Sequence, residues 1–306
     1  MTNQSTYRPG LHRYALAVGV CTWLLLLAGA LVTSNDAGLA VPDWPLSYGK
    51  LMPPMVGGIL YEHGHRLIAA SVGLLTILLA LWLWQTEPRR WLRRLGLLAL
   101  GLVILQGLLG GITVLFFLPS AISVAHACLA QLFFSTVVSI ALATSPTWHR
   151  PVLPLESAIS PRLRRLAVLT AAAVFAQLVL GALLRHKVLG VEAHVFGALV
   201  VVAAILRVAA TIRRHAAAHT ALQATAIWLR RFLVLQLILG VAAYWVRLLT
   251  RDASQPEPVT VLITVLHVTF GALLLAASVV LTWQVYRACG RTHAFPAPTP
   301  LPQRAA

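Results

Sequence analysis

The chain has 306 residues, of which 59% are hydrophobic and 10% are charged, and its mean hydropathy is +0.82. Soluble globular domains carry about 25% charged residues, so this composition excludes an ordinary soluble protein and predicts one that crosses a membrane several times. The formal net charge of +16 would suit a nucleic-acid partner unless its distribution along the chain has another explanation.

Apolar runs of the length that spans a bilayer, about 20 residues, predict eight helices. The first run follows Arg8 and Arg13 and resembles a signal peptide, but its apolar stretch from Tyr14 to Val32 is longer than the cleavable core of about 7 to 15 residues. We therefore expect an all-α membrane protein with eight transmembrane helices, at residues 13–33, 65–85, 95–118, 121–143, 165–185, 191–211, 228–249 and 259–286.

The basic residues are divided unequally between the two sides of the membrane that this arrangement predicts. With the N-terminus inside, 18 basic and two acidic residues fall on the inner side, whereas six of each fall on the outer side. The excess positive charge is therefore cytoplasmic, as the positive-inside rule requires. No basic patch is left over for a nucleic acid, and both termini are expected in the cytoplasm of a multi-pass protein of the cell inner membrane.

A Gln-to-Gly spacing of four residues is repeated along the chain. It occurs at Gln106 and Gly110, at Gln177 and Gly181, and at Gln236 and Gly240, while "LLLAG" ends at Gly29 in the equivalent place of the first helix. The helix after each of these carries one histidine near its start, and these four are His65, His126, His194 and His267.

The repeat predicts two four-helix bundles related by a pseudo-twofold axis along the membrane normal. The N-terminal half would span residues 1–145 and the C-terminal half 163–290, with a cytoplasmic linker at 146–162 and a cytoplasmic tail at 291–306. The histidines then form two pairs toward the outer side, His65 with His126 and His194 with His267. The Gln and Gly residues are interpreted mainly as interhelical packing and hydrogen bonding.

Four histidines at equivalent repeat positions indicate a function. A single helical histidine is usually a core residue, but ionisable groups within a membrane are costly and tend to mark functional sites. Two imidazoles from facing helices, with no cysteine or carboxylate cluster beside them, suit axial ligation of haem iron better than a zinc site with its three or four protein ligands. His63 lies two residues from His65, so the two do not share a helix face, and the sequence around them favours His65 as the ligand.

The chain resembles the haem A synthase family, bacterial and mitochondrial enzymes that oxidise a methyl group of haem O to the formyl group of haem A. The resemblance covers residues 10–290 and depends on "GLAVPDWPLSYG" at 38–49, on "EHGHR" at 62–66 and on the four histidines. It implies that His194 and His267 hold a resident haem b and that His65 and His126 ligate the substrate haem. It also implies that Glu62 is the essential carboxylate. The expected partners are haem O synthase and an electron acceptor in the membrane, and the oligomeric state is left open.

The first outer loop departs from the pattern of many bacterial members. These carry two cysteines beside the Trp-Pro sequence, and the corresponding positions here are Val41 and Ser47. A role for a thiol pair in this loop is therefore not carried over.

Glu62 lies three residues before His65, and residues at this spacing share a helix face. The carboxylate is therefore expected to face the haem that His65 ligates and to accept or relay a proton. The alternative is a carboxylate favoured by the dipole at a helix start. Arg66, together with Arg185 and Arg247, lies at an outer helix end and is a candidate contact for haem propionates, with interfacial snorkelling as the alternative.

Two other classes of function are considered. A non-enzymatic dihaem cytochrome b stacks its haems across the membrane, whereas four histidines at one depth place two haems side by side and favour exchange between a redox haem and a substrate haem. A transporter built on repeats is disfavoured because helices broken at the midplane are not predicted.

Overall fold

The computed structural model describes residues 7–290, and within them the chain is helical apart from its connections. Eight of the helices are long and apolar enough to cross a membrane, which confirms the predicted fold class. Their bounds are α1 (Pro9–Ser34), α2 (Gly57–Thr86), α3 (Arg90–Leu115), α4 (Ser120–Thr144), α6 (Ser160–Arg185), α7 (Val191–His215), α8 (Thr220–Leu249) and α9 (Pro258–Cys289).

Several helices extend beyond the apolar runs that predict them. Helix α2 begins at Gly57 and not at residue 65, and α8 begins at Thr220 and not at residue 228. Polar residues at these ends lower the local hydropathy without interrupting the helical hydrogen bonds. Helix α3 ends earlier than predicted, at Leu115, because Phe117 and Leu118 adopt positive φ angles.

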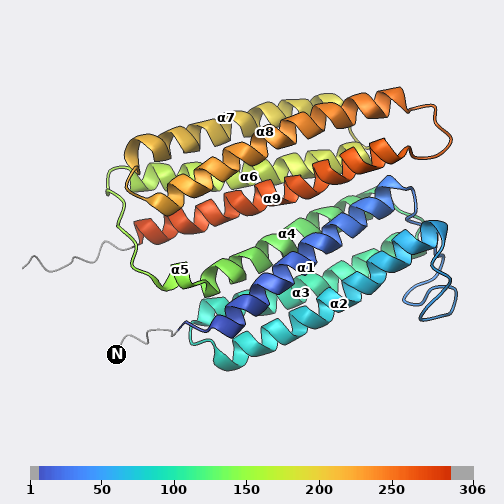
Figure 1. Cartoon of the computed structure of the whole chain (residues 1–306), viewed down its shortest axis with the longest axis horizontal. Coiled ribbons are helices and arrows are strands. Elements are labelled where there is room, and N and C mark those ends of the chain that lie inside the picture. Colours follow the sequence, from blue (N-terminus) through green and yellow to red (C-terminus); the bar gives the residue numbers. More distant parts are fainter. Residues whose placement is uncertain (1–6, 291–306) are drawn as a thin grey trace, which may run out of the picture.

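The eight long helices form two bundles (Figure 1). In the first, α1 packs against α2 and α4, and α3 packs against the same two helices; in the second, α6 packs against α7 and α9, and α8 packs against the same two. The bundles meet where α1 and α4 contact α9 and where α4 contacts α6. In both halves, helices that follow one another in the sequence therefore pack side by side. The pseudo-twofold axis that relates the halves stays a prediction.

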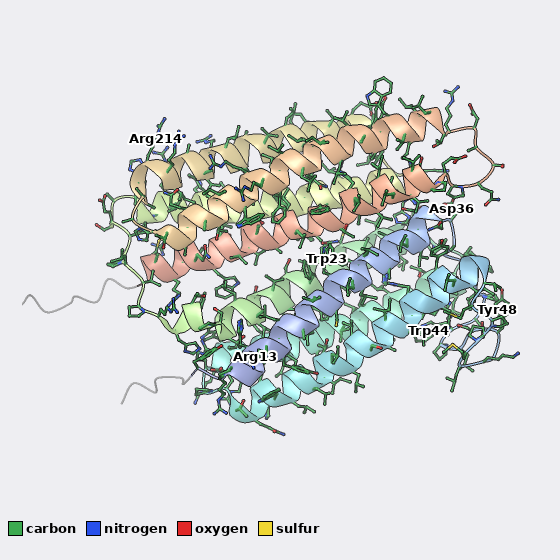
Figure 2. All side chains as sticks on the ribbon, in the orientation of Figure 1. Arg13, Trp23, Asp36, Trp44, Tyr48 and Arg214 are labelled. Atoms are coloured by element: carbon green, nitrogen blue, oxygen red, sulfur yellow. The ribbon has the colours of Figure 1, made fainter. Side chains whose placement is uncertain are left out.

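Each bundle buries its own apolar core. Buried residues of the first core include Leu79 and Phe133, and those of the second include Ile205 and Leu281. A smaller cluster joins the halves, where the indole of Trp23 on α1 also donates to the carbonyl of Thr269 on α9 at 3.2 Å. Figure 2 shows Trp23 midway along its helix, on the side of the second bundle.

The connection between the halves contains a short helix, α5 (Pro146–His149), and α6 begins at Ser160. The last residues of the predicted linker are therefore helical, while the domain boundaries themselves stay predictions. The predicted tail at 291–306, with Arg291, His293 and Arg304, lies outside the described residues.

The two ends of the molecule differ in composition. The loops α1–α2, α3–α4, α6–α7 and α8–α9 share one end, and the other connections share the opposite end (Figure 1). Figure 2 shows Arg13 and Arg214 at the second end and Asp36, Trp44 and Tyr48 at the first. The four histidines each lie near the start of a helix that leaves the first end.

Candidate functional site

Each of the four histidines packs its ring against a glycine on the preceding helix. A Cβ atom added to any of these glycines would lie 3.1 to 3.3 Å from the histidine Cε1 atom, closer than ordinary van der Waals contact. The absence of a side chain lets each ring approach the backbone of the neighbouring helix. The four contacts are Gly29 with His65, Gly110 with His126, Gly181 with His194 and Gly240 with His267.

Three of these contacts are reinforced by the glutamine that lies one helical turn before the glycine. The Nε2 atoms of Gln106, Gln177 and Gln236 donate to the main-chain carbonyls of the three later histidines at 3.0, 2.9 and 2.9 Å. The interpretation of the Gln and Gly residues as packing and hydrogen bonding is therefore confirmed. Helix α1 has Leu25 at the equivalent position, so the first repeat lacks this hydrogen bond.

The structure brings the histidines together in the two predicted pairs. The ring centroids of His194 and His267 are 6.3 Å apart, with an interplanar angle of 74°. Two imidazoles that ligate one metal ion from opposite sides at about 2 Å place their ring centres about 6 Å apart, so this separation fits a shared iron. His65 and His126 lie close enough for their charges to interact.

Three of the rings carry a buried nitrogen with no hydrogen-bond partner. This atom is Nδ1 in His65, His126 and His267. A buried nitrogen without a partner is costly, and imidazole nitrogen is a common ligand of metal ions. These three rings therefore suit the binding of a metal ion such as haem iron.

His194 differs from the other three histidines. The Nε2 atom of Gln177 lies 3.2 Å from its Nδ1 as well as 3.3 Å from its Nε2. The glutamines beside His126 and His267 contact only the ring Nε2, at 3.3 and 3.5 Å. Across residues 7–290, no group of three or more His, Cys, Asp or Glu side chains is placed to hold a metal ion. Each pair therefore offers two protein ligands, which is the number that haem takes from a protein in axial ligation.

Glu62 is buried, with only 4% of its surface exposed. Its Oε1 atom pairs with a guanidinium nitrogen of Arg66 at 2.5 Å, and its Oε2 atom accepts the N–H of Val41 at 2.8 Å. Because α2 begins at Gly57 and has no acidic residue in its first turn, the dipole at the helix start does not account for this carboxylate. Its position is set by Arg66 and by the loop.

Arg66 fastens the loop at residues 35–56 to α2. Besides its ion pair with Glu62, the guanidinium donates to the carbonyls of Asp43 at 2.7 Å and Leu46 at 2.9 Å, and to that of Val41 at 3.4 Å. In this structure the N–H groups of the Arg66 guanidinium donate to loop carbonyls. Its contact with a haem propionate stays a prediction. We call these contacts, with the carboxylate of Glu62, the Arg66 latch.

His63 faces a different neighbour from His65, as their spacing predicts. Its Nδ1 atom lies 2.7 Å from the hydroxyl of Ser47, and its buried Nε2 atom has no partner. Val41 and Ser47 are both buried and contact Glu62 and His63 respectively. Val41 and Ser47, the positions that correspond to the cysteine pair of the family resembled above, thus contact the "EHGHR" segment directly. The sequence did not predict this proximity.

The same loop also packs against α3. A Cβ added to Gly111 of α3 would lie 2.7 Å from the indole of Trp44, so the indole lies against the backbone beside Gly110. The Asp43 carboxylate accepts the N–H groups of Gly49 and Tyr48 at 2.8 and 2.6 Å, and these bonds hold the pKa of Asp43 below its usual range. Figure 2 shows Trp44 and Tyr48 together at this end.

Comparisons with known proteins find relatives of one kind. Residues 55–196 match the COX15-CtaA family, described as cytochrome oxidase assembly protein. The chain is 33% identical over 133 residues to a heme A synthase of Alkalihalophilus pseudofirmus and 35% identical over 133 residues to one of Shouchella clausii, in each case over 42% of this chain and 44% of the relative. It is 33% identical over 186 residues to a heme A synthase of Symbiobacterium thermophilum, over 58% of this chain and 59% of the relative.

The alignments therefore span about half the length of these relatives. The segment that matches the family contains the buried carboxylate and three of the four histidines: Glu62, His65, His126 and His194. By these matches the chain is similar, over part of its length, to the COX15-CtaA family of cytochrome oxidase assembly proteins and to bacterial heme A synthases, and its eight apolar helices suit a membrane protein.

Proposed function

We propose that the protein is a haem A synthase, which oxidises a methyl group of haem O to the formyl group of haem A. One observation carries this proposal. Of the four repeated histidines, only His65 has a buried carboxylate three residues before it. Glu62 precedes His65 by one helical turn and is fixed by an ion pair at 2.5 Å. A site that merely bound haem would have no need for this group.

His65 on α2 and His126 on α4 would ligate the substrate haem from its two sides. Their glycine contacts fix both rings against neighbouring helices, and two axial ligands restrain the position of the macrocycle between them. Holding the reactant at a fixed site beside Glu62 would lower the entropic cost of the reaction.

Glu62 would accept or relay protons. Conversion of a methyl to a formyl group removes two hydrogens from carbon and adds one oxygen, so protons must leave the buried site along with electrons. A positioned carboxylate contributes about 100- to 10,000-fold to such a step. Arg66 would hold the carboxylate in place, and the loop over it would limit access of water to the pocket.

His194 on α7 and His267 on α9 would hold a resident haem b. When bound, that haem supplies one-electron redox chemistry. Gln177 and Gln236 donate to the carbonyls of the two histidines and so fix the backbone that carries each ring. An electron acceptor in the membrane and haem O synthase are the partners that this function requires.

The orientation in the membrane is part of the proposal. The excess of basic residues supports a plasma-membrane protein with cytoplasmic termini and with both histidine pairs toward the outer side. A reporter placed after Arg291 should be found in the cytoplasm, and a reporter inserted near Lys50 should be found outside the cell membrane. The reverse result would contradict the placement of all four histidines.

The proposed activity is tested by expressing the protein in cells with and without a supply of haem O, extracting the haems and separating them by chromatography. Haem A should form only when both the protein and haem O are present. If the haem O supply leaves only haem b and unchanged haem O, the protein is better described as a dihaem b-type cytochrome without this activity.

A further inference from the structure

The end of the molecule opposite the histidines has a basic hollow between α6 and α7. It has a volume of about 190 Å³ and is lined by Arg162 of α6 and by Arg207, Ala210, Thr211, Arg214 and His215 of α7. Three arginines and one histidine thus surround the hollow with no acidic residue among its lining.

The lining residues of α7 follow from its sequence. Residues 207, 210, 211 and 214 have the spacing i, i+3, i+4 and i+7, which places them on one face of a helix. Ala210 and Thr211 are small, so the longer side chains of Arg207 and Arg214 flank a depression on that face. Arg162 closes it from α6.

These cations have no anionic partner in the part of the chain that the structure describes. The ion pairs there join Arg66 to Glu62, Arg89 to Glu87 and Arg251 to Asp252, and none involves a residue of the hollow. Arg162, Arg207 and Arg214 are exposed. Like charges gathered without a counter-charge favour binding of an anion.

The position of Arg207 along α7 indicates where that anion lies. The helix ends at His215, so Arg207 is about 12 Å from its end at a rise of 1.5 Å per residue. The polar layer on each side of a bilayer is about 5 to 8 Å thick. With the end of α7 at the membrane surface, as the proposed orientation requires, the α-carbon of Arg207 would lie within the hydrocarbon boundary, where an arginine side chain extends toward the interface. Arg214 lies two turns further on, at the end of the molecule opposite Asp36 and Trp44 (Figure 2).

The surface on the hydrocarbon side of the hollow is apolar. Leu169 lies two turns from Arg162 on the same face of α6, and Val200 lies two turns from Arg207 on the same face of α7. Their side chains are 50% and 45% exposed. An amphiphile can therefore place an anionic head in the hollow and an acyl chain along these helices.

We propose that this hollow binds the phosphodiester headgroup of an anionic membrane phospholipid of the cytoplasmic leaflet. Basic pockets between transmembrane helices are suited to such headgroups, and arginine offers several donors to phosphate oxygens. The site is separate from both histidine pairs and does not depend on the proposed enzymatic activity.

Native mass spectrometry of the purified full-length protein tests this site, with phosphatidylglycerol and phosphatidylcholine as probes. The wild type should retain one more phosphatidylglycerol molecule than the Arg207→Gln/Arg214→Gln double variant, with about tenfold weaker binding in each single variant, as expected for loss of a charge-assisted hydrogen bond. Arg207→Lys should keep most of the binding. Arg213→Gln is the matched control, because Arg213 is exposed on the same helix but does not line the hollow.

Equal retention of phosphatidylglycerol by the wild type and the double variant would overturn the proposal. So would equal retention of phosphatidylcholine and phosphatidylglycerol by the wild type. Displacement of phosphatidylglycerol by equimolar inorganic phosphate would show that the hollow is a site for free anions and not for a lipid.

Discussion

The two histidine pairs have a common scaffold and different surroundings. In both halves a ring packs onto a glycine of the preceding helix at nearly the same distance. The residue three positions before the histidine is Glu62 at the first position, whereas the other three positions have Ser123, Val191 and Thr264. Only the first pair combines a buried carboxylate with a cation beside the histidine.

The connections over the two pairs also differ. Residues 35–56 link α1 to α2 and are fastened to α2 by the Arg66 latch, whereas α6 and α7 are joined by residues 186–190 and α8 and α9 by residues 250–257. A repeated scaffold thus supplies two similar histidine pairs, and the buried carboxylate and the fastened loop distinguish the first pair from the second. We infer that the first half carries out the reaction and the second half holds the cofactor.

The largest effect is expected from Glu62→Gln, which keeps the shape of the side chain and removes its charge. The ratio of haem A to haem O in membranes should fall about 100- to 10,000-fold, while bound haem b is unchanged. Glu192→Gln is the matched control, since Glu192 lies exposed two residues before His194 in the other half. A normal ratio in Glu62→Gln would contradict the distinction between the halves.

A smaller loss is expected when the Arg66 latch is removed. Arg66→Gln should lower turnover about tenfold, the size of a lost charge-assisted interaction, and should speed tryptic cleavage after Lys50 because the loop is released. Arg251→Gln serves as control, since that arginine is exposed and pairs only with the neighbouring Asp252. Unchanged cleavage and turnover in Arg66→Gln would show that the loop is held by other contacts.

Replacing glycines that contact the histidines should distinguish the roles of the two halves while all four histidines stay in place. Gly240→Ala should displace His267 by a few tenths of an ångström, because a Cβ there would lie 3.1 Å from its ring, and should change the haem b spectrum. Gly29→Ala should lower turnover and leave that spectrum as it is. Gly107→Ala has no neighbour within 4 Å and should instead stabilise α3 by about 0.5 to 1 kcal/mol. If the haem b spectrum were the same in all three variants, close contact between Gly240 and the ring of His267 would be contradicted.

The smallest effect concerns Asp43. Its lowered pKa means that its bonds to the Gly49 and Tyr48 amides are present above the usual aspartate pKa and are lost only as the pH falls through the lower value. Asp43→Asn should therefore raise amide hydrogen exchange a few-fold at Tyr48 and Gly49 at neutral pH, with little change in turnover. Unchanged exchange at both amides would show that the carboxylate does not order the loop.

The helices and the histidine pairs could be predicted because their signals are long or repeated. Eight apolar runs specify eight spans, since a bilayer leaves the backbone few alternatives to a helix. The Gln and Gly spacing predicted interhelical packing, and the structure places Gly110 against His126 and Gly181 against His194, contacts that the spacing alone did not specify. The glycine in the sequence repeat and the contact between glycine and histidine each occur once in every pair of consecutive helices.

The loop contacts could not be predicted in the same way. The second apolar run begins at residue 65, because the polar residues Glu62 and His63 precede it. In the structure the helix begins at Gly57, and Glu62, the Nδ1 atom of His63 and Arg66 have partners in Val41, Ser47 and loop carbonyls. Such hydrogen bonds depend on the path of an irregular segment, which no periodicity specifies.

The division of labour between the halves is tested most directly by measuring haem b content and haem A formation in purified His65→Ala and His267→Ala variants. We expect His267→Ala to lose most of the bound haem b, and His65→Ala to retain that haem while forming no haem A. His126→Ala should behave as His65→Ala, and His194→Ala as His267→Ala. Equal loss of haem b from all four variants, or full turnover in His65→Ala, would contradict the assignment of the reaction to the first half and of the cofactor to the second.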